Sequence, residues 1–210
     1  MDAIIDGRYA LAEQHAREAL ENQAPHDHPE AQATLGVHLV DIRLLQGRAH
    51  EAVPLVAAAA DAYPHIAAYR GTLALCLLEA GDVAGARVAY RTFAERAFEL
   101  PPDSNWLLGI VALADTAAVL GEPGEAATLY EQLEPWAGRQ VVLNCYGGGG
   151  AYWGPVTHHL GLLAARRGDR PAAGDLLHRA VDDSEAFRAP LFATRSRAAL
   201  AALAYGRPGP

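Results

Sequence analysis

The sequence predicts an all-α protein, a right-handed superhelix of antiparallel helix pairs with a C-terminal capping helix. Three observations lead to this fold class. Hydrophobic residues make up 51% of the 210 residues and charged residues 20%, so a large core can form without a metal or a disulfide. A Gly followed five residues later by an Ala occurs five times. Each occurrence opens an apolar pattern with the period of an α-helix.

The repeated pair of residues has a physical explanation. We expect each Gly to end the first helix of a pair in a left-handed conformation, and each Ala to lie where the two helices approach most closely. The glycines are spaced 40, 34, 40 and 47 residues apart, and one interval equals the tetratricopeptide period of 34. The pattern therefore predicts a tetratricopeptide-like solenoid. The five pairs are Gly7 with Ala12, Gly47 with Ala52, Gly81 with Ala86, Gly121 with Ala126, and Gly168 with Ala173.

Caps and helix breakers give the boundaries of the helices. The first helices are expected at about 30–46, 65–80, 103–120 and 155–167. The second helices are expected at about 8–21, 49–62, 83–98, 123–134 and 170–187. A last helix at about 189–204 is expected to cover the end of the stack, because terminal repeats need a cap.

Prolines support most of these boundaries. Pro101 and Pro102 end one helix before the next begins, and Pro123 and Pro171 occupy first-turn positions where a missing N–H is harmless. Pro54 lies about one turn into its helix, so that helix is expected to start late or to kink.

We expect a single domain over residues 1–210, with units at about 1–21, 30–62, 65–98, 103–134 and 155–187 and a cap at 189–204. Residues 137–154 are expected to form a loop insertion, in which residues 140–146 favour a short extended segment. The glycines at 147–150 lack the Lys and Ser/Thr that a phosphate-binding loop carries into a helix. They form either a packed or flexible connection or a binding loop.

The first unit has a second helix, but only residues 1–6 precede it where a partner helix should lie. An uncovered apolar face is expected there. Either the chain is the C-terminal piece of a longer array, or these residues form a short N-terminal cap.

Charge and composition exclude several functions. All 17 basic residues are Arg, so a Schiff-base lysine and a Walker A lysine are both ruled out. The net charge of −8 disfavours direct binding to nucleic acid, because an acidic chain repels phosphate. The sequence shows no secretory signal and no apolar run of the ~18 residues that a membrane span needs, so we expect a cytoplasmic protein without a membrane partner.

The sequence offers no clear catalytic or metal site. His158 and His159 are adjacent on a predicted helix and point about 100° apart, so they cannot both face one ion unaided. No GxSxG motif is present, and Cys76 and Cys145 have no CxxC partner. The acidic run at 182–185 is expected to be a solvated helix face. We expect no catalytic residue, no metal and no cofactor.

The residues from about 141 to 204 carry a narrower resemblance. Trp153-Gly154-Pro155-Val156, the run from His159 to Ala164, and Gly168-Asp169 resemble the C-terminal helical repeats of large bacterial ATP-binding regulators, including LuxR-type activators and cyclase-fused relatives. The resemblance implies an array that binds a partner, attached to nucleotide-binding and sensor, cyclase or DNA-binding parts. This chain has no Walker motif and no helix-turn-helix, so ATP or DNA functions would belong to another portion.

The concave face of such an array is the expected binding surface. Its residues follow the small packing residues of the first helices, and a protein or peptide is the expected partner. A small hydrolase and an oligomerising scaffold that self-associates through its exposed N-terminal repeat are the alternatives. The predicted concave-face residues are Asp41, Leu75, Asp115, His158, Leu162 and Arg166, with Asp115 expected to be an exposed charge.

Overall fold

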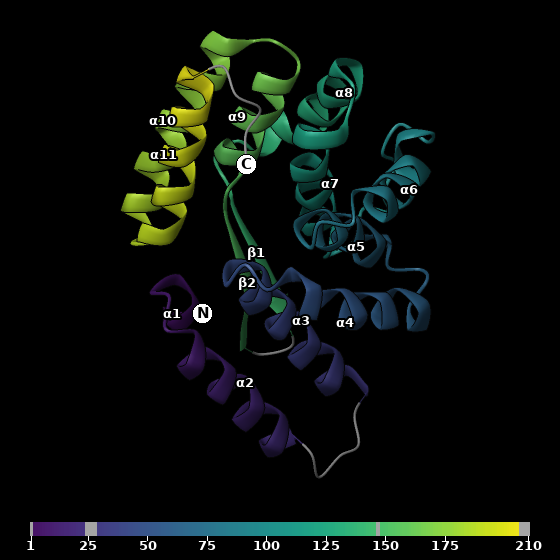
Figure 1. Ribbon diagram of the computed structural model, residues 1–210. Helices are drawn as coiled ribbons and strands as arrows, with labels where there is room; N and C mark the ends of the chain where they lie inside the picture. The colour runs from purple at the N-terminus through teal and green to yellow at the C-terminus, as the bar shows by residue number, and fades with distance from the viewer. Residues whose placement is uncertain (1, 24–28, 146–147, 206–210) are drawn as a thin grey trace.

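The computed structural model describes residues 2–23, 29–145 and 148–205. Eleven α-helices account for most of this part of the chain, and two strands form its sheet (Figure 1). The prediction of a predominantly α-helical protein is therefore confirmed. The two-stranded sheet was not anticipated in full.

The predicted helices occur close to their expected positions. The first helices of the pairs are α3 (Pro29–Leu45), α5 (Ala67–Glu79), α7 (Trp106–Leu120) and α9 (Val156–Arg166). The second helices are α2 (Tyr9–Gln23), α4 (Ala49–Ala62), α6 (Val83–Ala94), α8 (Pro123–Leu133) and α10 (Arg170–Ala186). The remaining elements are α1 (Asp2–Ile5), the 3-10 turn η2 (Glu134–Trp136), β1 (Gln140–Cys145), β2 (Gly148–Pro155) and α11 (Pro190–Ala204).

Successive helices pack against one another from α2 to α11. In addition, α7 packs against both α5 and α9, so these three helices form a central row (Figure 1). The approach of α5 to α7 is close because Gly109 has no side chain. A Cβ at that position would lie 2.9 Å from the Cα of Ala68. All five alanines of the repeated pattern are buried in the interior.

Four of the five predicted left-handed turns are present, at Gly7, Gly47, Gly81 and Gly168. At each turn, the Gly N–H donates to the carbonyl three residues back, and the next residue's N–H donates to the carbonyl five residues back. This is the hydrogen-bond pattern of the Schellman motif. Asp82 and Asp169 then cap the following helices through their carboxylates.

The left-handed conformation predicted for Gly121 is wrong. Its φ of −73° and ψ of 158° are extended, and they lead into Glu122 and the first-turn Pro123. Gly is nevertheless required there for space, because a Cβ would lie 2.7 Å from the Tyr90 hydroxyl. Gly is therefore needed for close packing at this turn, whereas at the other four turns it is needed for the left-handed backbone conformation.

Replacing Gly81 by Val is expected to lower the free energy of unfolding by about 1 to 3 kcal/mol, because a β-branched residue is strained at its φ of +87°. No atom would contact the new Cβ, so the cost isolates the backbone conformation. Urea denaturation measures the change. Gly81→Asn is the control, since Asn tolerates this region better. Equal losses in the two variants would contradict the assignment.

Two helix ends differ from a predicted position. Helix α6 ends at Ala94 rather than near 98, because the chain turns through positive φ values at Ala97 and Phe98. This turn buries Phe98 beside the Tyr90 ring, with ring centroids 5.5 Å apart. Of the two outcomes expected for Pro54, a late start does not occur, since helix α4 begins at Ala49 and contains Pro54; a kink at Pro54 stays a prediction.

The loop expected at 137–154 is instead largely a β-hairpin. Strands β1 and β2 pair antiparallel, and the pairing joins Val142 to Tyr152 and Gln140 to Pro155. The extended segment expected from residue 140 is confirmed for 140–145, whereas Gly147 lies outside the described residues. The hairpin runs through the middle of the molecule from the start of α9 to α3 (Figure 1), and it contacts α3, α7, α9 and α10. Strands pair through their backbones and show no helical period in the sequence, so the helical pattern could not identify this hairpin.

The apolar residues at the start of the chain are covered. Ala3, Ile4 and Ile5 of α1 are buried, and α1 contacts α11. Ile5 packs in one cluster with Tyr152 and Phe192. The expectation of an uncovered apolar face at this point is therefore wrong. Within the described residues, no helix has the length and apolar character needed to cross a membrane.

The acidic run at 182–185 is only partly solvated. Asp182 and Glu185 are exposed as expected. Ser184 is buried and donates to the Ala180 carbonyl, while Asp183 accepts a 2.8 Å hydrogen bond from the Thr157 hydroxyl. The run therefore helps to hold α10 against α9.

Candidate binding site: the central cavity

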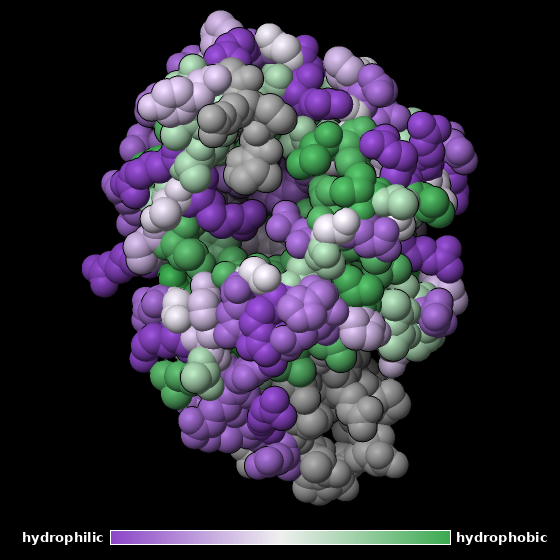
Figure 2. All heavy atoms as spheres, viewed as in Figure 1, coloured by the Kyte–Doolittle hydropathy of each residue, from purple (hydrophilic) through white to green (hydrophobic). Residues whose placement is uncertain are grey.

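A cavity of about 200 Å³ lies where the first helices, the hairpin and the last helix meet. A second chamber of about 120 Å³ shares three of its lining residues, Glu79, Asp115 and Arg195. We call the two spaces together the central cavity. Figure 2 shows a hollow in the middle of this face of the molecule, with hydrophilic side chains around it. The larger space is lined by residues of α3, α5, α7, β2 and α11, and the smaller one by residues of α5, α7, α9 and α11, elements that are distant in sequence.

Five of the six predicted concave-face residues line the central cavity. Asp41, Leu75 and Asp115 line the larger space, and Asp115 also lines the smaller one with His158 and Leu162. The sixth, Arg166, has a different place. Its Nε donates a 2.6 Å hydrogen bond to the Gly121 carbonyl, which ties α9 to the turn before α8.

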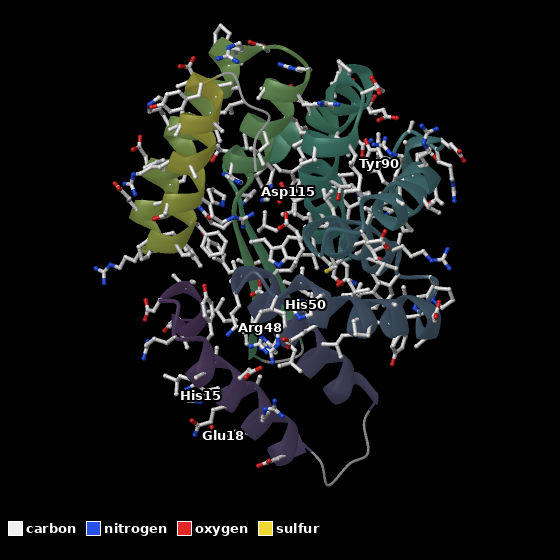
Figure 3. All side chains as sticks on the ribbon, viewed as in Figure 1. His15, Glu18, Arg48, His50, Tyr90 and Asp115 are labelled. Carbon is white, nitrogen blue, oxygen red and sulfur yellow. The ribbon has the colours of Figure 1, made fainter. Side chains whose placement is uncertain are left out.

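The packing residues explain why the predicted positions converge. Ala74, Ala114 and Gly161 are buried where the helices are in closest contact. The next residue on each helix is rotated by about 100° and reaches the neighbouring face. In α7 that residue is Asp115, which Figure 3 labels in the middle of the molecule.

Asp41 is the most unusual residue of the cavity wall. It is only 2% exposed, and its carboxylate accepts a single long hydrogen bond, 3.4 Å from the Tyr152 N–H. Burial raises the pKa of Asp41 to about 7, although the Tyr152 N–H, Arg195 and the nearby Trp153 indole partly oppose the rise. The Trp153 Nε1–H has no hydrogen bond of standard geometry. The cavity therefore contains a carboxylate that is poorly compensated.

Asp115 is paired rather than exposed, so the expectation of an exposed groove charge is wrong. Its side chain is 10% exposed, and its Oδ1 lies 2.5 Å from the Nδ1 of the fully buried His159. Burial opposes ionisation of Asp115, but the charge and hydrogen bond of His159, with Arg195 and His158, bring its pKa below the ordinary value. His159 is held in place at its other nitrogen, Nε2, 3.2 Å from the Trp153 carbonyl oxygen.

His158 lies beside His159 but has a different environment. Its Nδ1 is 2.9 Å from the Ser196 hydroxyl, which itself donates to the Phe192 carbonyl. Ser196 is therefore the acceptor, and His158 Nδ1 carries the proton. Burial, followed by the charges of Arg195 and His159, lowers the pKa of His158 to about 3. His158 is neutral at physiological pH.

The cavity residues that were not predicted include the polar or aromatic Glu79, Tyr152, Trp153 and Arg195. Glu79 lies four residues after Leu75 on the same helix face, so helical periodicity could have identified it. Burial and the charge of Asp115 raise the pKa of Glu79. Tyr152 and Trp153 belong to the hairpin and Arg195 to the capping helix, and no sequence signal placed them at the cavity.

The charges of the cavity favour a cation. Three carboxylates, Asp41, Glu79 and Asp115, face one guanidinium, that of Arg195, whose Nη2 lies 3.9 Å from Asp115 Oδ2. Asp115 is already paired with His159, but among the residues that the structure describes, Asp41 and Glu79 have no cationic partner within ion-pair distance. In the part of the chain that the structure describes, no three His, Cys, Asp or Glu side chains are grouped so as to hold a metal ion.

The Ser, His and Asp side chains near the cavity do not form a catalytic triad. Ser196 contacts His158, whereas Asp115 contacts the neighbouring His159. A triad needs the carboxylate to orient the same imidazole that activates the hydroxyl. Ser196 is also fully buried, so a substrate has no access to its oxygen.

Comparison of the chain with protein-family models, with curated proteins and with solved structures gives no match. The resemblance to the helical repeats of bacterial regulators therefore stays a prediction.

Proposed function

We propose that this protein is a noncatalytic binding module, whose central cavity receives a basic side chain of a protein or peptide partner. The observation that carries the proposal is the buried, poorly compensated carboxylate of Asp41 in a cavity that contains two more carboxylates. A guanidinium or ammonium group would give Asp41 the charged hydrogen bonds that it lacks. Leu44, Leu45 and Leu75 on the wall would contact the aliphatic part of such a side chain.

We further propose that the helix pairs form a tetratricopeptide-like, right-handed superhelix. The four Gly turns with a common hydrogen-bond pattern and the buried alanine five residues after each Gly support this proposal. The row of α5, α7 and α9 is the arrangement expected of the first helices in such an array. By its resemblance to bacterial regulators, the module would work in transcription or signalling in the cytoplasm.

A peptide panel tests the binding proposal. The probes are pentapeptides with a central Arg in an alanine background, and the same peptides with a central Gln or Glu. Calorimetry is expected to show the strongest binding for Arg and none for Glu. Asp41→Asn should weaken binding of the Arg peptide at least tenfold, because a charge-assisted hydrogen bond is lost. The exposed Asp182→Asn on α10 is the matched control and should leave affinity unchanged.

The same titration has a defined pH dependence. The cation binds the ionised form of Asp41, whose pKa is about 7, so affinity should rise between about pH 6 and pH 8. The change approaches tenfold for each pH unit below the pKa. Asp41→Asn should remove this dependence. Equal binding of the Arg, Gln and Glu peptides would refute the proposed site and would favour the oligomerising scaffold, which light scattering on a dilution series detects.

A further inference from the structure

One charged residue of the central cavity has no role in the proposed function, and that residue is the cation Arg195. Its side chain comes from α11 and is 41% exposed, whereas Asp41 on α3 is only 2% exposed. Arg195 therefore lies toward the opening of the cavity, and Asp41 lies toward its floor. In Figure 1, α11 and α5, the helix of Glu79, lie on opposite sides of the middle of the molecule. Since Arg195 lines both spaces of the cavity, a ligand that reaches Asp41 passes beside it.

The guanidinium of Arg195 has unused hydrogen-bonding capacity. Its Nη2 lies 3.9 Å from Asp115 Oδ2, which is within ion-pair distance but too long for a hydrogen bond. Its Cζ also lies 5.8 Å from the centre of the Phe192 ring. Among the residues that the structure describes, Arg195 donates no hydrogen bond. A guanidinium carries five N–H donors in a planar fork, and this fork fits a carboxylate.

Arg195 shares the cavity with carboxylates that it does not contact. Burial raises the pKa of Asp41 and of Glu79, and the charge of Arg195 opposes the rise in both. Nevertheless, in the described part of the chain the guanidinium forms no ion pair with either side chain. Opposite charges therefore face one space of about 200 Å³ without meeting. One water molecule needs only about 10 to 15 Å³ of a cavity, so the space has room for an organic ligand.

A ligand with a single positive charge suits this cavity only in part. Its cationic group would gain the carboxylate of Asp41, but it would share the cavity with the guanidinium of Arg195, and like charges repel. A carboxylate on the same ligand would remove this conflict, because it would accept charge-assisted hydrogen bonds from Arg195. The wall residues Leu75 and Leu191 would contact the carbon atoms that join the two charged groups.

We propose that the central cavity binds a basic amino acid that carries its own free carboxylate, with the cationic side chain at Asp41 and the carboxylate at Arg195. This inference rests on the proposed function, and it narrows the ligand from any basic side chain to one that is accompanied by a carboxylate. Two sources supply this chemistry, the C-terminal residue of a peptide and a free amino acid. An Arg within a peptide lacks the carboxylate and should bind more weakly.

The first test needs only the unmodified chain. The probes are two N-acetylated pentapeptides of four alanines and a C-terminal Arg, one ending in the free carboxylate and the other in an amide. Calorimetry is expected to show about tenfold tighter binding of the carboxylate form, because only this form gains a charge-assisted hydrogen bond from Arg195. L-arginine and L-argininamide form a second matched pair. Tighter binding of the peptide acid would identify a C-terminus as the source, and tighter binding of L-arginine would identify the free amino acid.

The second test assigns the carboxylate to Arg195. Arg195→Gln should bind the carboxylate and amide forms equally, because the guanidinium is lost while Asp41 is unchanged. Arg197→Gln is the matched control, since Arg197 lies on the same helix and pairs with Glu185 at the surface. This control should keep the full preference for the carboxylate. Asp41→Asn should weaken both forms alike, and circular dichroism checks that each variant keeps its helices.

The outcomes separate this inference from the proposed function. Equal affinity of the carboxylate and amide forms for the unmodified chain, with Arg still preferred to Gln, would overturn the inference and leave the proposed function standing. A preference for the carboxylate that persists in Arg195→Gln would also overturn it. Loss of the preference for Arg over Gln would instead refute the proposed function itself.

Discussion

Asp41→Asn is expected to stabilise the fold by about 2 to 4 kcal/mol near pH 8 and to have almost no effect near pH 4. The pKa of this carboxyl rises from 3.8 to about 7 on folding, chiefly through burial. A difference of this size corresponds to about 4 kcal/mol between the ionised and protonated forms. Asn resembles the protonated acid in shape, and its carbonyl can still accept the Tyr152 N–H.

The sign follows from proton binding. Between pH 3.8 and about 7, the folded chain binds more protons at Asp41 than the unfolded chain does, so the free energy of unfolding falls as the pH rises. His158 acts in the opposite direction. Because its pKa falls from 6.5 to about 3 on folding, it destabilises the fold as the pH falls. The difference between wild type and Asp41→Asn cancels the contribution of His158.

Urea denaturation of both proteins across this pH range measures the difference. The exposed Asp182→Asn serves as the control and should show a small change that does not depend on pH. A difference between wild type and Asp41→Asn that is the same at pH 4 and pH 8 would show that Asp41 titrates normally. A cation in the central cavity should reduce the stabilising effect, since it gives the ionised carboxylate a partner.

Asp115→Ala and His159→Ala are each expected to lower the free energy of unfolding by about 3 to 5 kcal/mol. Removing one member of a buried pair leaves the other without compensation, and His159 also fills space in the core. The double variant should lose less than the sum of the two single losses. Urea denaturation at neutral pH provides the four values of this double-mutant cycle.

An exposed ion pair provides the comparison. Glu185 and Arg197 form an ion pair at the surface with both side chains about half exposed, so Glu185→Ala should change stability little. If Asp115→Ala were as mild as Glu185→Ala, the pair with His159 would not be a structural element. Asp115 would then be available to a partner, as sequence reasoning alone suggested.

The repeated Gly and Ala determined the helices and most of their turns. Local effects explain this success, because a left-handed Gly, an N-cap carboxylate and a helical period act over a few residues. Gly81 and Gly168 behave as their sequence context predicts, whereas Gly121 is followed by Glu122-Pro123 and takes an extended conformation. The end of α6 at Ala94 depends on the distant packing of Phe98 and could not be predicted locally.

The sequence by itself also brought five candidate residues to one face, because each follows a small packing residue or lies a helical turn away from one. It did not determine what covers that face. The hairpin places Tyr152 and Trp153 over Asp41, and α11 brings Arg195 to Asp115. These contacts join residues about 80 to 110 positions apart, as the separation of 111 positions between Asp41 and Tyr152 shows. Helical periodicity assigns a side chain to a face, but only the tertiary structure decides the burial and charge of its surroundings, and with them the pKa and the ligand.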